Sequence, residues 1–96
     1  MRTTKRDDPR LADAFGKALR SARARGGMTQ AEAAAAAGMG STTLWRLERG
    51  ERLPDVEQLS RLADAYRVTL TWIVESAEQI TAVVDEGAVP PGTPSA

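Results

Sequence analysis

The sequence predicts an all-α fold, a compact domain of five helices. The chain has 96 residues, which is the size of a single domain. Hydrophobic residues make up 42% of it but aromatic residues only 4%, so the core must consist mainly of alanine, leucine and valine side chains. Apolar residues also recur at helical spacing in several separate stretches, two of which begin with a capping box. These three observations favour a small helical fold.

The first helix is expected to begin after Asp8, an N-cap residue followed by Pro9, which suits the first helical position. Residues 1–8 are polar and lack periodicity, and they predict a flexible basic arm. The apolar face of the helix is formed by Leu11, Phe15, Ala18, Leu19 and Ala22. Gly26 and Gly27 end it.

The second helix is predicted from Thr29 and Glu32, which have the spacing of a capping box. It covers about residues 30–37 and stops before Gly38. The segment Gly38-Met39-Gly40 is long enough only for a tight turn.

A third helix follows this turn, with Leu44 and Leu47 on its inner side and Gly50 at its end. Two helices joined by a tight turn that contains glycine form a helix-turn-helix, which places its second helix in the DNA major groove. The small Ala34 suits a close approach of the two helices, and Gly38 suits a positive φ in the turn. The alternative is an ordinary helical hairpin within a bundle.

The fourth helix is predicted from Asp55 and Gln58, which form the second capping box. Its apolar face is expected to contain Val56, Leu59, Leu62, Ala63 and either Tyr66 or Ala65.

The fifth helix starts at Thr69 and keeps a helical period to about Glu86. Its apolar positions are Leu70, Ile73, Val74, Ala77, Ile80, Thr81 and Val84. Residues 75–86 would therefore extend the helix beyond a compact domain of residues 9–74. Residues 87–96 are rich in proline, glycine and small residues, and they predict a disordered tail.

Composition excludes several classes of function. The chain has no cysteine and no histidine, which removes zinc fingers, disulfide frameworks and Ser-His-Asp triads. The segment GMGSTT lacks the third glycine of a dinucleotide loop and the Gly-Lys pair of a P-loop. We therefore expect no enzyme, no cofactor, no metal and no small-molecule ligand. No apolar run approaches the roughly 20 residues of a membrane helix, and a cytoplasmic protein with no membrane partner is expected.

Charge is distributed unevenly, although thirteen basic and thirteen acidic residues give a formal net charge of zero. Residues 1–53 hold eleven basic and six acidic side chains, whereas residues 54–96 hold two basic and seven acidic ones. The two parts thus carry formal charges of +5 and −5. Such an asymmetry indicates an N-terminal surface that can meet an anion.

Two stretches of the chain, TQAEAAAAAGMGSTTLWRLERG and RLADAYRVTLTWIV, follow a known pattern. On these stretches the chain, from Phe15 to about Val74, resembles the Cro/C1-type (XRE-like) helix-turn-helix family of phage repressors and bacterial transcriptional regulators. It implies a lambda-repressor-like domain of five helices that binds double-stranded DNA. Ala33 and Ala37 replace the larger aliphatic residues usual in the family, and Gly40 replaces the usual Ser or Thr cap. A loosely packed second helix and a mobile turn are expected from these departures.

Helix geometry selects the residues of the third helix, at about 41–49, that would read DNA. If Leu44 and Leu47 point inward, then the residues that point away from the core are Thr42, Trp45, Arg46 and Arg49. Arg46 can donate two hydrogen bonds to a guanine edge, and the alternatives are a phosphate contact or a solvated side chain. Trp45 is expected either to contact a thymine methyl or sugar edge, or to fold over the second helix.

The start of the third helix carries a cluster of hydroxyl side chains that suits a phosphate or a base edge, namely Ser41, Thr42 and Thr43. Simple capping is the alternative for Ser41. The resemblance also implies that Gln30 contacts the phosphate backbone. Weaker, sequence-neutral phosphate contacts are assigned to Lys17, Arg20, Arg25 and Arg52, with a solvated surface as the alternative.

Two further expectations concern structure and assembly. The resemblance implies that Arg23 and Glu48 form an ion pair that ties the first helix to the third. Ile80, Val83 and Val84 lie beyond the usual core, so they either fold back onto the domain or form a self-association surface. A homodimer that reads paired half-sites about 34 Å apart is favoured.

The function predicted from these observations is sequence-specific binding of duplex DNA by a transcriptional regulator, most simply a repressor that blocks RNA polymerase. The alternative is a protein-interaction module, such as the antitoxin half of a toxin–antitoxin pair or a bridging factor. Strong salt dependence of DNA binding would separate the two.

Overall fold

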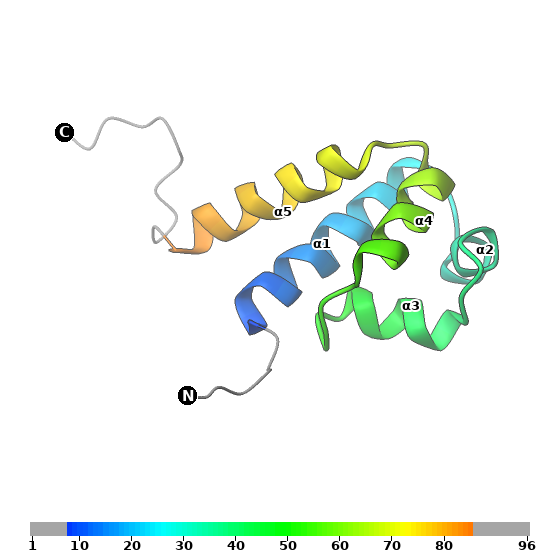
Figure 1. The fold of residues 1–96 in the computed structure, drawn as a ribbon, viewed down its shortest axis with the longest axis horizontal. Helices are drawn as coiled ribbons and strands as arrows, with labels where there is room; N and C mark the ends of the chain where they lie inside the picture. Colours follow the sequence, from blue (N-terminus) through cyan, green and yellow to red (C-terminus); the bar gives the residue numbers. More distant parts are fainter. Residues whose placement is uncertain (1–7, 86–96) are drawn as a thin grey trace.

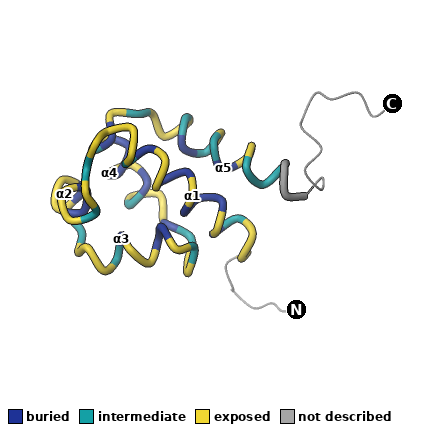
Figure 2. Tube along the Cα trace, turned by 180° about the vertical axis from the view of Figure 1, so that it is seen from behind, coloured by how far each residue is buried: buried dark blue, intermediate teal, exposed yellow. Residues whose placement is uncertain are grey.

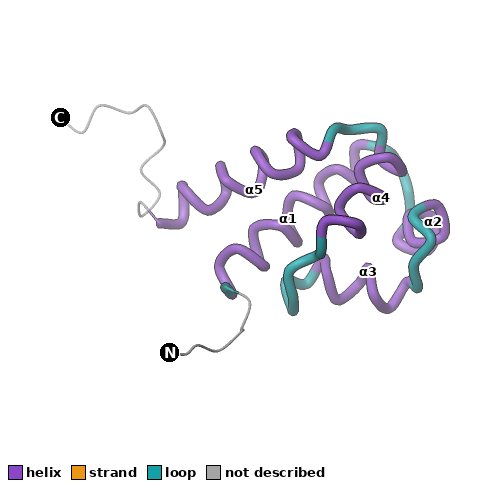
Figure 3. The backbone as a smooth tube through the Cα atoms, viewed as in Figure 1, coloured by secondary structure: helices purple, strands orange, loops and turns teal. Residues whose placement is uncertain are grey.

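The computed structural model describes residues 8–85, with side chains described as far as residue 82. This part of the chain forms five α-helices and no strand (Figures 1 and 3), which confirms the all-α prediction. The helices are α1 (Pro9–Arg25), α2 (Gln30–Ala36), α3 (Ser41–Glu48), α4 (Val56–Tyr66) and α5 (Leu70–Asp85). The arm expected for residues 1–8 lies outside the described residues except for Asp8, and the tail expected for residues 87–96 lies outside them entirely.

The helix starts follow the capping signals in the sequence. The Asp8 side chain accepts a hydrogen bond of 2.9 Å from the backbone N–H of Arg10 at the start of α1. At α2, both hydrogen bonds of the Thr29–Glu32 capping box are present, at 2.9 and 3.1 Å. A second complete box opens α4. These bonds satisfy backbone N–H groups that have no partner within the helix.

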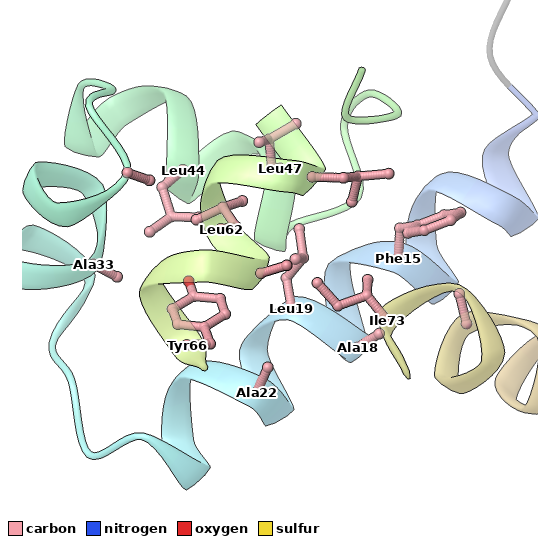
Figure 4. Packing of buried hydrophobic residues seen from close by; sticks show 14 of the residues in the cluster. Phe15, Ala18, Leu19, Ala22, Ala33, Leu44, Leu47, Leu62, Tyr66 and Ile73 are labelled. Atoms are coloured by element: carbon pink, nitrogen blue, oxygen red, sulfur yellow. The ribbon is translucent and has the colours of Figure 1, made fainter. Parts of the chain in front are cut away.

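A small aliphatic core joins α1, α3, α4 and α5. Its largest fully buried side chains are Leu19, Leu44, Leu47, Leu62 and Ile73. Figure 4 shows Leu44 and Leu47 of α3 lying close to Leu62 of α4, with Leu19 of α1 below them. In the view of Figure 1, α5 lies along the upper edge of the molecule and α3 along the lower edge, with α1 and α4 between them. The helix expected to meet DNA is therefore packed on one side and open on the other.

The buried apolar residues of α2 and its C-cap are all alanines. Ala33, Ala34 and Ala37 are buried and belong to the core cluster. Figure 2 shows that the outer sides of α2 and α3 are exposed.

Two of the predicted core positions are wrong. Val56, expected on the inner face of α4, is 71% exposed, and Leu70, expected on the inner face of α5, is 36% exposed. Each is the first residue of its helix, where the chain approaches from outside the packed interior. Of the two residues proposed for the end of α4, Tyr66 is buried and Ala65 is half-buried.

The helix α5 packs along α1, which buries Ile73 and Ala77. Ile80 is half-buried against the core. Of the two expected arrangements, packing back onto the domain or self-association, this residue therefore adopts the first. Val83 and Val84 lie in the last turn of α5, where side chains fall outside the described residues. Among the described helices, none combines the length and the apolar character needed to cross a membrane.

Candidate nucleic-acid interface

The turn between α2 and α3 is built on Gly38, whose φ is +69°. This left-handed conformation is strained for residues that carry a Cβ. The backbone N–H of Met39 donates to the carbonyl of Ala34 at 2.9 Å, and that of Gly38 donates to Ala35 at 3.1 Å. These bonds close the end of α2 and redirect the chain into α3. The predicted helix–turn–helix geometry is present.

The buried carboxylate of Glu48 links three helices at the far end of α3. Its side chain is 1% exposed. Arg23 of α1 donates to both carboxylate oxygens, from Nε at 2.7 Å and from Nη2 at 3.0 Å. Gln30 of α2 donates from Nε2 to Oε1 at 2.9 Å. Because a buried carboxylate needs such partners, the end of α3 is held against both α1 and α2.

The same cluster perturbs two titratable groups. Its hydrogen bond with Glu48 raises the pKa of Arg23, with desolvation acting in the opposite direction. Burial raises the pKa of the Tyr66 phenol, and the nearby charge of Glu48 adds to this effect. The Arg23 guanidinium therefore stays charged at the end of α3, and the phenol stays neutral.

The Gln30 side chain is not a free surface group, which is all that a phosphate contact would require. Its side chain is half-buried, and its amide nitrogen is engaged by Glu48. The residue thus connects α2 to α3 within the domain.

Two glycines bring α1 into direct contact with α3: Gly16, for which the sequence predicts no role, and Gly50, which it predicts only to end the third helix. A Cβ on Gly16 of α1 would lie 2.6 Å from the carbonyl oxygen of Glu48 and 2.8 Å from that of Leu47. Gly50 has a φ of +76°, and its Cβ would lie 2.8 Å from the Cα of Asp13. The backbones of α1 and of the end of α3 therefore touch directly. An isolated glycine inside an amphipathic helix was the available signal for Gly16.

The outward face of α3 contains the four residues selected by helix geometry. Thr42, Trp45, Arg46 and Arg49 are all exposed. Ser41 is also exposed, and Thr43 is half-buried. Ser41 is the first residue of α3 rather than its cap, because the N-cap is Gly40, which provides no side-chain hydrogen bond. The N–H groups at the start of α3 therefore have no capping side chain of their own.

The arginines of this face differ in their partners. The Arg49 guanidinium lies over the Trp45 ring, 4.6 Å from its centroid, and its Nε donates to Glu51 at 2.9 Å. The Arg46 side chain makes no hydrogen bond or ion pair within the described part of the chain. Its guanidinium is thus available to a ligand.

The four basic residues assigned to weaker contacts are dispersed. Lys17 pairs with Asp13 on the surface of α1 at 3.2 Å, and Arg52 is exposed in the loop after α3. Arg20 donates to the backbone carbonyl of Glu48 at 3.4 Å, which places it beside the end of α3. Arg25 lies over the Trp72 ring of α5 at 5.2 Å. Figure 1 places that end of α1 away from α3.

Within the described residues, no group of three or more acidic side chains is arranged to hold a metal ion. The outward face of α3 offers hydroxyl, indole and guanidinium groups. These groups suit an anionic polymer with hydrogen-bond acceptors on its edges.

Known proteins match this chain over the same region. Residues 14–71 match a protein family described as a helix-turn-helix domain. The HTH-type transcriptional regulator ImmR of Bacillus subtilis (strain 168) is 36% identical over 64 residues, which cover 67% of this chain and 50% of that protein. The chain thus spans half the length of this relative.

Solved structures agree with the sequence matches. The clp gene regulator ClgR from Corynebacterium glutamicum superposes with a TM-score of 0.76 at 31% identity, covering 80% of this chain and 82% of that one. The restriction-modification controller protein C.AhdI from Aeromonas hydrophila gives a TM-score of 0.62 at 26% identity, covering 65% of this chain and 94% of that one. With the α2–turn–α3 geometry described above, these matches show that the chain belongs to the helix-turn-helix family, in its Cro/C1-type (XRE-like) group.

Proposed function

We propose that this protein recognises a short duplex DNA site by inserting α3 into the major groove and represses transcription by occupying that site. The observation that carries the proposal is the exposure of Thr42, Trp45, Arg46 and Arg49 on one face of α3. The opposite face is buried through Leu44 and Leu47, so the helix presents a single surface in a fixed orientation.

Arg46 is the principal base-reading residue in this proposal, because its guanidinium has no partner among the described residues. Two parallel hydrogen bonds to guanine O6 and N7 are the contact that an arginine in this position makes best. Ser41, Thr42 and Thr43 lie at the start of α3, where hydroxyls and free N–H groups suit a phosphate. Gln30, Lys17, Arg20, Arg25 and Arg52 are proposed as phosphate contacts that carry no sequence information.

We also propose that two copies assemble through the end of α5 and read paired half-sites. Ile80 packs against its own domain. Of the three residues predicted to self-associate, Val83 and Val84 are therefore the two that we assign to the dimer contact. Sedimentation equilibrium at micromolar concentration tests the dimer. Val84→Asp is expected to give monomers, whereas the control Gln79→Asp, at an exposed position of the same helix, is expected to stay dimeric. A wild-type monomer would contradict the dimer.

In this proposal the protein binds DNA and catalyses no reaction. In a bacterial cell it would act in the cytoplasm, at the nucleoid. Selection of tight binders from a random duplex library, followed by fluorescence anisotropy at two salt concentrations, tests it. A selected site that binds more tightly than a scrambled duplex, with an affinity that falls steeply with salt, is the expected result. Equal weak binding to both duplexes would contradict the proposal and favour a protein partner.

A further inference from the structure

Trp45 gives the outward face of α3 an apolar surface among polar and basic neighbours. Trp45 is 44% exposed. Because tryptophan has the largest apolar area of any residue type, this fraction is a large apolar surface. An indole ring has one hydrogen-bond donor and no acceptor, so nearly all of its exposed surface can make only apolar contacts.

The ring is held from one side by a charged pair. The Arg49 guanidinium, one helical turn further on, lies 4.6 Å from the ring centroid. Its Nε donates to the carboxylate of Glu51 at 2.9 Å. A guanidinium that stacks on an aromatic face and is paired with a carboxylate at the same time has little freedom to reach a base. Arg49, held by Glu51, therefore covers one face of the indole, and part of the remaining ring surface is exposed to solvent.

The major groove offers one matching partner for such a surface. Among the groups on base edges there, the C5-methyl of thymine is the apolar one, whereas guanine, adenine and cytosine present only donors and acceptors. We propose that Trp45 reads thymine through this methyl group, and that Arg49, paired with Glu51, is a positioning residue that holds the indole ring for the contact. The inference rests on the proposed function, because it requires α3 to lie in the major groove.

The experiment starts from the site that the full chain selects from a random duplex library. Each thymine is replaced, one at a time, by deoxyuridine, which removes the methyl group and leaves the hydrogen-bonding edge unchanged. Affinities are measured by fluorescence anisotropy at one fixed salt concentration. One thymine in each half-site is expected to weaken binding by about fourfold when its methyl is lost, the effect of exposing one buried methyl group. The other replacements are expected to have little effect.

Protein variants assign this effect to the ring. Trp45→Ala is expected to bind the thymine and deoxyuridine duplexes equally. The matched control is Trp72→Phe, in the other tryptophan–arginine pair of the chain, where Arg25 lies 5.2 Å from the ring centroid on α5. Phenylalanine keeps most of the packing of this half-buried residue. The Trp72→Phe variant should therefore keep the wild-type ratio of the affinity for the thymine duplex to the affinity for the deoxyuridine duplex.

The positioning role of Arg49 is tested by the same ratio. Arg49→Met keeps the length of the side chain but removes its charge, so the ratio of the two affinities should fall toward one. Arg49→Lys, which keeps a cation over the ring, should restore part of it. A loss of fold or of general DNA affinity would lower both affinities and leave their ratio unchanged.

The possible failures are distinguishable. Equal binding to selected and scrambled duplexes would overturn the proposed function together with this inference. Selective binding with no thymine effect above twofold, or with an effect that persists in Trp45→Ala, would overturn the inference alone. An unchanged ratio in Arg49→Met would remove the positioning role.

Discussion

The guanidinium of Arg23 and the carboxylate of Glu48 meet through two hydrogen bonds, of 2.7 and 3.0 Å, between residues 25 positions apart in the chain. The Glu48 side chain is 1% exposed and that of Arg23 is 19% exposed. Arg23 also donates from Nη1 to the carbonyl of Met28 at 3.0 Å. One pair therefore joins the first helix, the loop before α2 and the last residue of α3.

Removing the charge of Glu48 should destabilise the domain strongly. In Glu48→Gln the Arg23 guanidinium loses its charged partner while remaining largely buried, and the free energy of unfolding should fall by about 3 kcal/mol. Urea denaturation measures the change. The control is Glu57→Gln, because the Glu57–Arg61 pair is at least half exposed and such pairs contribute about 0 to 1 kcal/mol. Equal losses in the two variants would contradict the role given to Glu48.

Gly16→Ala should destabilise the protein even though alanine is the better helix former. Its Cβ would lie 2.6 Å from the carbonyl oxygen of Glu48, so α1 and α3 must move apart, at a cost of about 2 kcal/mol. Thermal unfolding followed by circular dichroism provides the test. At Gly26 the nearest atoms would be 3.6 Å from the added Cβ, so Gly26→Ala should melt close to the wild type. A Gly16→Ala protein that melts above the wild type would rule out the close approach.

Tyr66→Phe should stabilise the protein. The Tyr66 hydroxyl is buried and has no hydrogen-bond partner among the described residues, so its removal should raise the free energy of unfolding by about 1 kcal/mol near neutral pH. Denaturant titration at neutral pH measures this difference. A less stable variant would mean that the phenol gains a partner in solution.

The raised pKa of Tyr66 predicts that the protein loses stability at alkaline pH. Because burial raises the pKa of Tyr66 in the folded state, the unfolded chain loses its phenol proton above about pH 10 while the folded chain keeps it. The unfolded state then binds fewer protons, and wild-type stability falls as the pH rises through this range. Tyr66 is the only tyrosine of the chain, so Tyr66→Phe should lack this component. Its advantage over the wild type should therefore grow between pH 8 and pH 11, and a constant difference would contradict the argument.

Arg46→Ala should weaken binding to the selected DNA site by about 1 to 3 kcal/mol and relax the preference at one base pair. Anisotropy titrations with the selected site and with single-base variants measure both effects. The control is Arg67→Asn, which also removes one positive charge, and asparagine tolerates the left-handed φ of +60° found there. Figure 1 places the end of α4 away from α3, so the control should bind normally. Similar losses in the two variants would reduce Arg46 to a general electrostatic contact.

Much of the fold follows from short-range patterns that the sequence contains. The capping pairs Thr29–Glu32 and Asp55–Gln58 mark the starts of α2 and α4, because each cap involves residues only three positions apart. Helical periodicity likewise selects Leu44 and Leu47 as the buried side of α3. These predictions succeed because the interactions that decide them are local.

The sequence by itself thus determined the helices, their caps, the glycine turn and the outward face of α3. Only the tertiary structure decided that Gln30 binds Glu48, that Gly16 and Gly50 bring α1 against α3, and that Val56 remains exposed. The stacking of Arg49 on Trp45, and its pairing with Glu51, also depended on which of several rotamers each side chain adopts. Each of these outcomes depends on how helices or side chains meet in space, and the spacing of residues along one helix does not specify that meeting.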